Sequence, residues 1–281
     1  MSNNFEIDNI ILNALKEDMP FGDLTTESII HEDQVSEASI IAKEDGVIAG
    51  TRAFGRVFEL LDAGIEITYY VNDGDKVKPK DVLIYLRGKT CALLKGERTA
   101  LNLLGILSGI ATKTAKFVEE VKDFPVTITD TRKTTPGLRF LQKYAVRVGG
   151  GINHRFCLSD GVLIKDNHIK AAGGITNAVK MAHKRIPHTV KIEVETETLE
   201  QVAEAVECGA DIIMLDNMDY EMMKKAVIYI NKRALTEASG NVELLNGRKV
   251  RDVALTGVDI ISVGDLTHTI DNLDISMRIV L

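Results

Sequence analysis

The first hundred residues alternate between helical and strand-like patterns of hydrophobic positions. Apolar residues recur at helical spacing over 7–15 and 54–61, and Thr51 is the expected N-cap of the second helix. Period-two runs predict strands, and Asp-Gly pairs predict turns. The expected strands are 39–42, 66–71 and 82–86, and the expected turns are 45–46 and 73–74. This mixture is typical of a small α+β domain.

A long helical stretch begins at Thr90 and reads TCALLKGERTALNLLGILSGIATKTAKFVEEV. Its leucines fall on nearby helix faces, which predicts a helix that links two domains. Because glycine weakens a helix interior, we expect a break at Gly105 or at Ser108-Gly109.

Beyond this stretch, apolar strand-like runs alternate regularly with amphipathic helical segments. The strands are expected near 126–129, 162–164, 190–194, 212–215, 235–238 and 260–263. The helices are expected near 139–148, 176–185, 198–208, 220–232 and 243–255. Such an alternation predicts βα units and a parallel sheet, either open or closed.

Polar or glycine residues follow the carboxyl end of each of these six strands. They are Asp130, Lys165, Glu195, Asp216, Ser239 and the run Ser262-Val263-Gly264. In a (β/α) barrel these positions meet at one mouth, where such enzymes place their chemistry. We therefore predict an α/β protein: a (β/α) barrel-type catalytic domain, complete or incomplete, with a smaller α+β N-terminal sandwich domain. The predicted domains are 1–108, joined by a C-terminal strand at 272–281, and 109–271.

Composition excludes several classes of protein. With 281 residues, 45% hydrophobic and 27% charged, the chain has an ordinary globular balance. No run approaches the roughly 20 apolar residues that span a bilayer, and the N-terminus shows no secretory signal pattern. Cys91, Cys157 and Cys208 are widely spaced and form no CxxC pair. We expect a protein of the cytoplasm, without a membrane partner.

Charge is unevenly distributed along the chain. The net charge of −7 argues against nucleic acid as a partner, yet residues 130–170 hold eight Lys or Arg against three acids. Converging cations in a low-dielectric cleft favour a small anion with several charges. A solvated basic face remains the alternative.

The basic residues in this segment occur in three motifs. DTRKTTPGLR contains Arg132-Lys133, a pair suited to a ligand with more than one anionic group. GGGINHR adds His154-Arg155 next to glycines that permit close backbone approach, although a flexible surface loop would look the same. Lys165 ends an apolar run, where an inward-facing lysine needs an anion.

The acidic residues come one strand later. In VKIEVET, Lys191, Glu193 and Glu195 share one strand face, and in DIIMLDN, Asp216 ends the next strand. Such a carboxylate pair can bind sugar hydroxyls, hold Mg²⁺ with a phosphate-bearing ligand, or stabilise an oxocarbenium ion. Salt bridges to Lys133 or Lys165 are the structural alternative. The Ser/Gly turns in EASGN and ISVGDLTH suit a phosphate group.

The passage VNDGDKVKPKDVLIYLRG resembles half of a biotinyl/lipoyl carrier domain. A carrier presents its modified lysine on a hairpin between two such halves, and this sequence has no matching hairpin. We therefore interpret the passage as structural.

Taken in order, ERTALNLLGILSGIAT, DTRKTTPGLR, YAVRVGGGINHR, LIKDNH, IEVET, DIIMLDN, EASG and GVDIISVGDLTH resemble the motifs of the quinolinate phosphoribosyltransferase family. The resemblance implies a pentosyltransferase of de novo NAD synthesis. Its substrates would be quinolinate and phosphoribosyl pyrophosphate, its cofactor Mg²⁺, and its products nicotinate mononucleotide, pyrophosphate and CO₂. It also implies a homodimer, or a higher oligomer built from it, with the active site shared across the interface.

The resemblance also implies roles for individual residues. The catalytic set would be Lys133, Lys165, Glu195 and Asp216. Arg132, Lys133, His154, Arg155 and Lys165 would hold the carboxylates and the pyrophosphate, with Arg98 of the neighbouring subunit. Glu195 and Asp216 would meet the ribose hydroxyls and the metal, directly or through the substrate, and Ser239, Gly240, Ser262 and Gly264 would bind the phosphate. Asn241 stands where the family usually has a second glycine.

Two alternatives remain at this point. The fingerprint of open-sheet phosphoribosyltransferases, two adjacent acids before a Thr-Gly loop, is absent, because Asp216 is followed by Asn217. The nearest enzymatic alternative is a relative that accepts nicotinate without decarboxylation, and the non-enzymatic one is the carrier module.

Overall fold

The computed structural model describes residues 4–244 and 248–280, which group into two compact units. Unit 1 comprises the chain up to Ala115, Thr134–Gly150 and the chain from Thr267. Unit 2 comprises Lys116–Lys133 and Gly151–Leu266. The boundary that we expected between residues 108 and 109 falls inside the long helix α4 (Thr90–Val121).

Unit 1 contains an antiparallel four-stranded sheet in the order β14-β1-β5-β3. Its strands are β1 (Val35–Ala42), β3 (Glu66–Tyr69), β5 (Val82–Lys89) and β14 (Ile275–Val280). The last strand of the chain therefore pairs with the first, and Ala42 lies opposite Ile275. Alternate residues of β1 are withdrawn from solvent, as period-two patterning requires. The three strands predicted in this region are confirmed.

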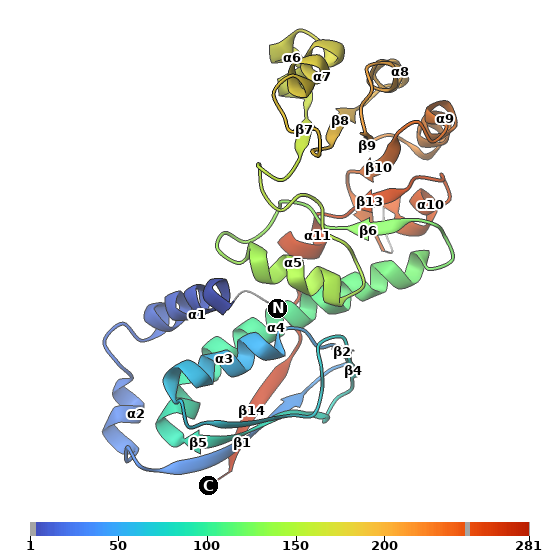
Figure 1. Cartoon of the computed structure of the whole chain (residues 1–281). Coiled ribbons are helices and arrows are strands. Elements are labelled where there is room, and N and C mark those ends of the chain that lie inside the picture. The colour runs from blue at the N-terminus through green and yellow to red at the C-terminus, as the bar shows by residue number, and fades with distance from the viewer. Residues whose placement is uncertain (1–3, 245–247, 281) are drawn as a thin grey trace. The chain divides into compact units, whose positions relative to one another are not determined.

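Helices α3 (Thr51–Leu61) and α4 run across this sheet (Figure 1). The buried rings of Phe54 and Phe58, 5.2 Å apart between centroids, give α3 its apolar face. The predicted N-cap, Thr51, is wrong. Gly50 takes that position with a φ of 95°, and the Asp73 carboxylate accepts the N–H groups of Gly50 and Thr51. A turn distant in sequence thus supplies the cap.

The break predicted in α4 is also wrong, because the helix is continuous over 32 residues. Its glycines serve close packing. A Cβ at Gly109 would lie 2.0 Å from the carbonyl oxygen of Asp271, and one at Gly105 would lie 3.1 Å from that of Leu273. Glycine is required here by the passing backbone of residues 271–273, and not by a bend.

Among the residues described, unit 1 has five further elements outside the four-stranded sheet and helices α3 and α4. They are α1 (Asn4–Asp18), α2 (Leu24–Ile29), β2 (Gly46–Val47), β4 (Lys76–Val77) and α5 (Arg139–Val148). Strands β2 and β4 form an antiparallel pair. Helix α11 (Asp265–His268) lies at the boundary of the two units in the sequence.

Unit 2 is built on a parallel six-stranded sheet in the order β6-β13-β10-β9-β8-β7. Its strands are β6 (Thr127–Thr129), β7 (Val162–Ile164), β8 (Ile192–Thr196), β9 (Ile212–Asp216), β10 (Leu235–Ser239) and β13 (Ile260–Ser262). All six strands predicted for this region are confirmed. In the described part of the chain the sheet ends at β6 and β7, so the barrel is incomplete.

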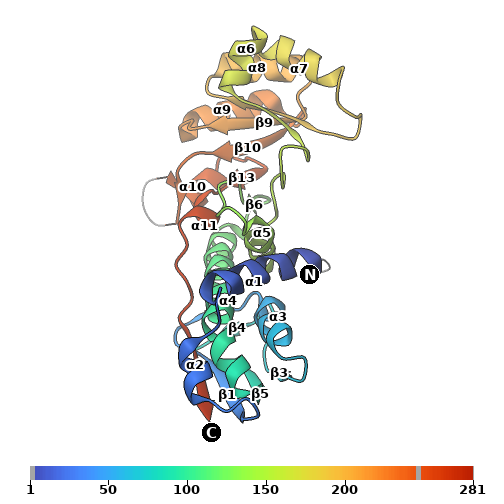
Figure 2. The ribbon, with the colours of Figure 1, turned by 90° about the vertical axis from the view of Figure 1, so that its left-hand side faces the viewer.

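Helices α8 and α9 lie side by side on one side of this sheet, seen again from the side in Figure 2. The helices of unit 2 are α6 (Asp166–Ala172), α7 (Ile175–His183), α8 (Leu199–Glu207), α9 (Tyr220–Ile230) and α10 (Val250–Ala254). Helix α6 was not predicted. The helix predicted over 243–255 is wrong, because only α10 is helical there. Strands β11 (Val242–Glu243) and β12 (Arg248–Lys249) precede it, and residues 245–247 lie outside the described residues.

Candidate active site

The carboxyl ends of the strands in unit 2 bring polar side chains to one edge of the sheet. The parallel register pairs Ser239 with Asp216 and Ser262 with Thr129. Lys165 directly follows β7, and Glu195 is the fourth residue of β8. These residues lie in or directly after the six strands of the sheet, which is the convergence that a barrel mouth requires.

Lys165 and Glu195 form an ion pair between Nζ and Oε2. The strands β7 and β8 are adjacent, so the pair links two neighbouring strand ends. The Glu195 side chain is 13% exposed and that of Lys165 is 46% exposed. The salt bridge that the sequence left open for Lys165 is therefore present, and an anionic ligand at Lys165 would share this cation with Glu195.

Asp130 anchors the loop that contains His154 and Arg155. Its fully buried carboxylate accepts hydrogen bonds from the Asn153 amide at 2.7 Å and from the backbone N–H of His154 at 3.0 Å. The N–H of Lys133 donates to the Thr131 hydroxyl at 3.1 Å. Asp130, directly after β6, thus holds the segment Asn153–His154 in place.

Arg132 and Arg155 lie close enough for their charges to interact. Burial, and next the positive charge of Arg132, lower the pKa of the Arg155 guanidinium, while Glu193 opposes this shift. Arg155 also donates to the carbonyl oxygen of Gly161 at 2.9 Å. Two cations from separate motifs are therefore held together in unit 2, and this arrangement suits a ligand with several negative charges.

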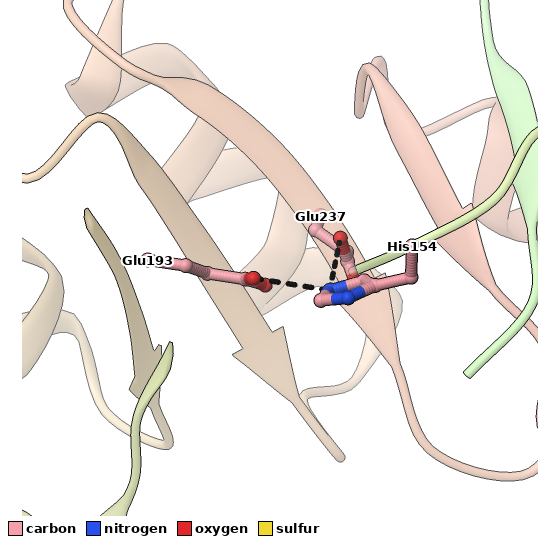
Figure 3. A group of neighbouring side chains, drawn as sticks. All are labelled: His154, Glu193 and Glu237. Carbon is pink, nitrogen blue, oxygen red and sulfur yellow. Dashed lines mark ion pairs between the residues drawn. The ribbon is translucent and has the colours of Figure 1, made fainter. Parts of the chain in front are cut away.

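His154 lies between two buried carboxylates, which point toward its imidazole in Figure 3. Nε2 is 3.0 Å from Oε2 of Glu193 and 3.6 Å from Oε2 of Glu237. Nδ1 accepts the N–H of Arg155 at 2.8 Å, so the proton between imidazole and carboxylate belongs to Nε2. Burial, and next the charge of Glu193, raise the pKa of Glu237 to about 7.

Sequence reasoning missed Glu193 and Glu237 as members of the site. Each stands two residues before a predicted site residue, Glu195 and Ser239 respectively, and so shares its strand face. That spacing was a usable signal. It was overlooked because only the strand ends were expected to carry chemistry.

A cavity of about 270 Å³ adjoins this cluster. It is lined by His154, Arg155, Glu193 and Glu237, together with the first residues of three strands, Val162, Ile212 and Ile260. Lys165, Glu195 and Asp216 do not line it. The cavity therefore extends toward the amino ends of the strands, while the predicted catalytic residues lie at the carboxyl ends.

The turn after β10 has a left-handed backbone. Gly240 has a φ of 98° and Asn241 a φ of 47°, so two successive residues are left-handed. Asparagine is among the few non-glycine residues that adopt this conformation readily. Asn241 can therefore replace the family's second glycine. The Ser262 hydroxyl donates to the carbonyl oxygen of Ala238 at 3.3 Å.

Arg98 belongs to unit 1, where it lies on helix α4. Its side chain is 76% exposed, and its Nη2 is 3.7 Å from Oε1 of Glu97. This local contact is a loose ion pair on a helix surface, which contributes little to stability.

One group of side chains in the described residues could hold a metal ion, namely His154, Glu193 and Glu237, whose ligand atoms lie within 4.8 Å of one another. The predicted metal ligands, Glu195 and Asp216, are not part of it. Mg²⁺ prefers oxygen ligands, whereas a mixed imidazole and carboxylate set suits transition metals. Of these two sets, the carboxylates of Glu195 and Asp216 have the better chemistry for Mg²⁺.

Family models match both parts of the chain. The model of the C-terminal domain of quinolinate phosphoribosyl transferase matches residues 110–278, and that of its N-terminal domain matches residues 23–108. The chain belongs to the quinolinate phosphoribosyl transferase family. It is therefore a phosphoribosyltransferase of NAD biosynthesis. The carrier-like passage, residues 71–88, lies within the family's N-terminal domain.

Individual relatives resemble the chain over nearly its whole length. The probable carboxylating nicotinate-nucleotide pyrophosphorylase of Bacillus subtilis (strain 168) is 45% identical over 279 residues, which cover 99% of this chain and 95% of that protein. The decarboxylating, mitochondrial quinolinate phosphoribosyltransferase 2 of Nicotiana glauca is 40% identical over 98% of this chain and 82% of its own length.

Solved structures share the fold of this family member. NadC from Streptococcus pyogenes has a TM-score of 0.94 at 42% identity, covering 99% of this chain and 97% of that one. Human nicotinic acid phosphoribosyltransferase has a TM-score of 0.61 at 12% identity, covering 100% and 74%. The second likeness shows the fold alone. Within the described residues, none of the helices has the length and apolar character needed to cross a membrane.

Proposed function

We propose that this chain transfers a phosphoribosyl group from phosphoribosyl pyrophosphate to quinolinate and releases CO₂. The ring nitrogen forms a bond to C1′ while the bond from C1′ to pyrophosphate breaks. The carbon–carbon bond to the adjacent carboxylate then breaks, and a proton from water replaces CO₂. The products are nicotinate mononucleotide, pyrophosphate and CO₂. The names of two relatives support the proposal. One is called a carboxylating pyrophosphorylase and the other a decarboxylating phosphoribosyltransferase, which describe the same reaction in opposite directions.

The observation that carries this proposal is the pairing of cations from two motifs. The positive charge of Arg132 helps to lower the pKa of the Arg155 guanidinium, and Lys165 directly follows strand β7 of the same unit. Quinolinate has two carboxylates, and the second substrate has several phosphate charges. Each arginine can bind a carboxylate in a bidentate way, so two arginines fix both its position and its orientation.

The chemistry asks little of the protein beyond positioning and charge. Once the ring nitrogen is bonded to C1′, its positive charge stabilises the carbanion that decarboxylation leaves at C2. No further electron sink is needed. The proposed roles of Glu195 and Asp216 are to bind the ribose hydroxyls and stabilise positive charge that develops at C1′.

We further propose Mg²⁺ as the cofactor. Two carboxylates on the adjacent strands β8 and β9 match its usual protein ligands, since Mg²⁺ takes one or two carboxylates plus substrate phosphates. When bound, Mg²⁺ would neutralise the charge of the leaving pyrophosphate. Glu195 and Asp216 would hold it directly or through the substrate.

We also propose a homodimer, or a higher oligomer of it, in the cytoplasm. Unit 1 exposes large apolar side chains near its N-terminus, including Phe21 at 97%, Phe5 at 85% and Leu24 at 82%. Exposed apolar groups of this size favour a protein interface. The exposed Arg98 would then enter the active site of the second copy. The three free cysteines suit a reducing compartment.

Turnover with defined substrates tests the proposed reaction. Purified protein with Mg²⁺ and phosphoribosyl pyrophosphate is given quinolinate or nicotinate, and CO₂ and mononucleotide are measured. We expect equal amounts of both products from quinolinate only. Turnover of nicotinate without turnover of quinolinate would contradict the proposal and favour the non-decarboxylating relative.

A further inference from the structure

Asn217 directly follows β9 and has a left-handed backbone with a φ of 53°. Asparagine adopts this conformation more readily than other non-glycine residues, because its short polar side chain can form hydrogen bonds to nearby groups. Asn217 stands between two parts of the site that come from different strands, Asp216 at the end of β9 and the Ser239–Gly240 turn after β10. Its contacts show what holds it there.

Three contacts join Asn217 to these neighbours. Its backbone N–H donates to the carbonyl oxygen of Ser239 at 3.1 Å. Its side-chain Nδ2 donates to Oδ2 of Asp216 at 2.9 Å. Its Oδ1 faces Gly240, where an added Cβ would lie only 2.1 Å away. The direction of the amide is fixed chemically, because its NH₂ faces a carboxylate that can only accept when ionised.

Gly240 is required for two separate reasons. Its φ of 98° lies in a region that side chains rarely adopt, and the Asn217 amide fills the space that a Cβ would take. The turn after β10 is therefore shaped around the side chain that follows β9.

We propose that Asn217 is a positioning residue that fixes the Asp216 carboxylate and the Ser239–Gly240 turn relative to each other. This inference rests on the proposed function, in which Asp216 meets the ribose and the turn meets the phosphate of the same substrate. Those two ends of phosphoribosyl pyrophosphate are a fixed distance apart. A residue that holds their two binding groups at one spacing lowers the cost of organising the site when the substrate binds.

The competing explanation is that Asn217 only completes a turn. Two variants separate the backbone from the side chain. Asn217→Gly keeps the left-handed backbone and removes the amide, and Asn217→Asp keeps the size while placing a second carboxylate beside Asp216. Asn231 supplies the matched control, because it has a similar φ of 46°, ends helix α9 and is exposed.

We expect Asn217→Gly to raise the KM for phosphoribosyl pyrophosphate by about tenfold, the typical effect of one lost hydrogen bond to a charged group. The KM for quinolinate should stay within about twofold. Asn217→Asp should cost more, because like charges repel. Asn231→Gly and Asn231→Asp should leave all constants unchanged. Thermal unfolding checks that each variant is folded.

Binding measurements distinguish this proposal from the proposed function. Calorimetric titration with phosphoribosyl pyrophosphate and Mg²⁺ should show the same loss of about tenfold for Asn217→Gly. A wild type that binds this compound but does not convert quinolinate contradicts the proposed reaction, and the variant's affinity still decides the role of Asn217. A wild type that does not bind it overturns both.

Equal KM changes for both substrates, or wild-type constants in both Asn217 variants, would overturn the positioning role.

A double-mutant cycle adds a structural readout. Gly240→Ala should cost less affinity in the Asn217→Gly background than alone, because the overlapping amide is gone. Additive costs would mean that the two residues are not coupled.

Discussion

Oε2 of Glu237 lies 3.6 Å from Nε2 of His154, and both side chains are largely withdrawn from solvent. Glu193 approaches the same imidazole nitrogen, so three titratable groups share one buried cluster. Burial and the charge of Glu193 raise the pKa of Glu237 to about 7. The cluster is therefore a source of pH-dependent stability.

We predict that replacing Glu237 with Gln removes part of this pH dependence. The unfolded chain releases the Glu237 proton above its ordinary pKa of 4.5, whereas the folded chain keeps it up to about pH 7. The folded state thus binds more protons in this window, and the free energy of unfolding falls as pH rises, by up to about 1.4 kcal/mol per unit. Urea unfolding of the wild type and of Glu237→Gln at pH 5 and pH 7.5 measures this change in the free energy of unfolding. Parallel pH profiles would contradict the assignment.

Removal of Lys165 should abolish most activity. Lys165→Ala removes a cation proposed to bind substrate and leaves Glu195 without this partner. Charge-assisted contacts are worth roughly 1.5–3 kcal/mol and positioning adds to that, so kcat/KM for quinolinate should fall by about two orders of magnitude or more. Lys170→Ala is the control, since the Lys170 side chain is 75% exposed and pairs with Asp166 of the same helix, α6. Near wild-type turnover in a folded Lys165→Ala variant would make this lysine structural.

Activity in mixed dimers should reveal whether Arg98 acts in trans. Arg98→Ala and Lys133→Ala are each expected to be inactive but folded, because both side chains are exposed. After dissociation and mixing in equal amounts, half the dimers contain both chains and each has one intact site. About a quarter of wild-type activity should return. If mass spectrometry shows that heterodimers form but no activity returns, Arg98 either acts in the active site of its own chain or is not part of an active site.

Packing on α4 predicts a graded effect of alanine. Gly109→Ala places a Cβ 2.0 Å from the Asp271 carbonyl oxygen, and Gly105→Ala places one 3.1 Å from that of Leu273. Overpacking typically costs about 1–3 kcal/mol, which outweighs the gain of about 1 kcal/mol in helix propensity. We expect Gly109→Ala to lower the free energy of unfolding more than Gly105→Ala. A stabilised Gly109→Ala variant would show that the glycine marks a weak point of the helix after all.

Local patterns in the sequence were enough to find most elements of both units. Period-two runs predicted β1, β3 and β5, and the βα alternation predicted every strand of the parallel sheet. Strand ends then predicted where Lys165, Glu195 and Asp216 would gather, because parallel neighbours present the same end to one edge. Each strand was predictable because its pattern involves residues close together in the chain, and the parallel order of the strands brings their ends to one edge.

Other features depended on contacts between segments that are distant in the chain, and local patterns do not encode such contacts. The cap of α3 comes from Asp73, and the continuity of α4 depends on the backbone at Asp271. Glu193 and Glu237 were not predicted to meet His154, because three separate segments bring them together.

By itself, the sequence determined the order of elements, the parallel sheet and the residue types at its edge. Tertiary structure decided which of those residues are paired, buried or coupled. Lys165 pairs with Glu195 because β7 and β8 are neighbours in the folded sheet. Asn217 contacts Gly240 because β9 and β10 are neighbours. Propensity and periodicity act within a few residues, whereas charge, burial and close packing depend on every neighbour in space.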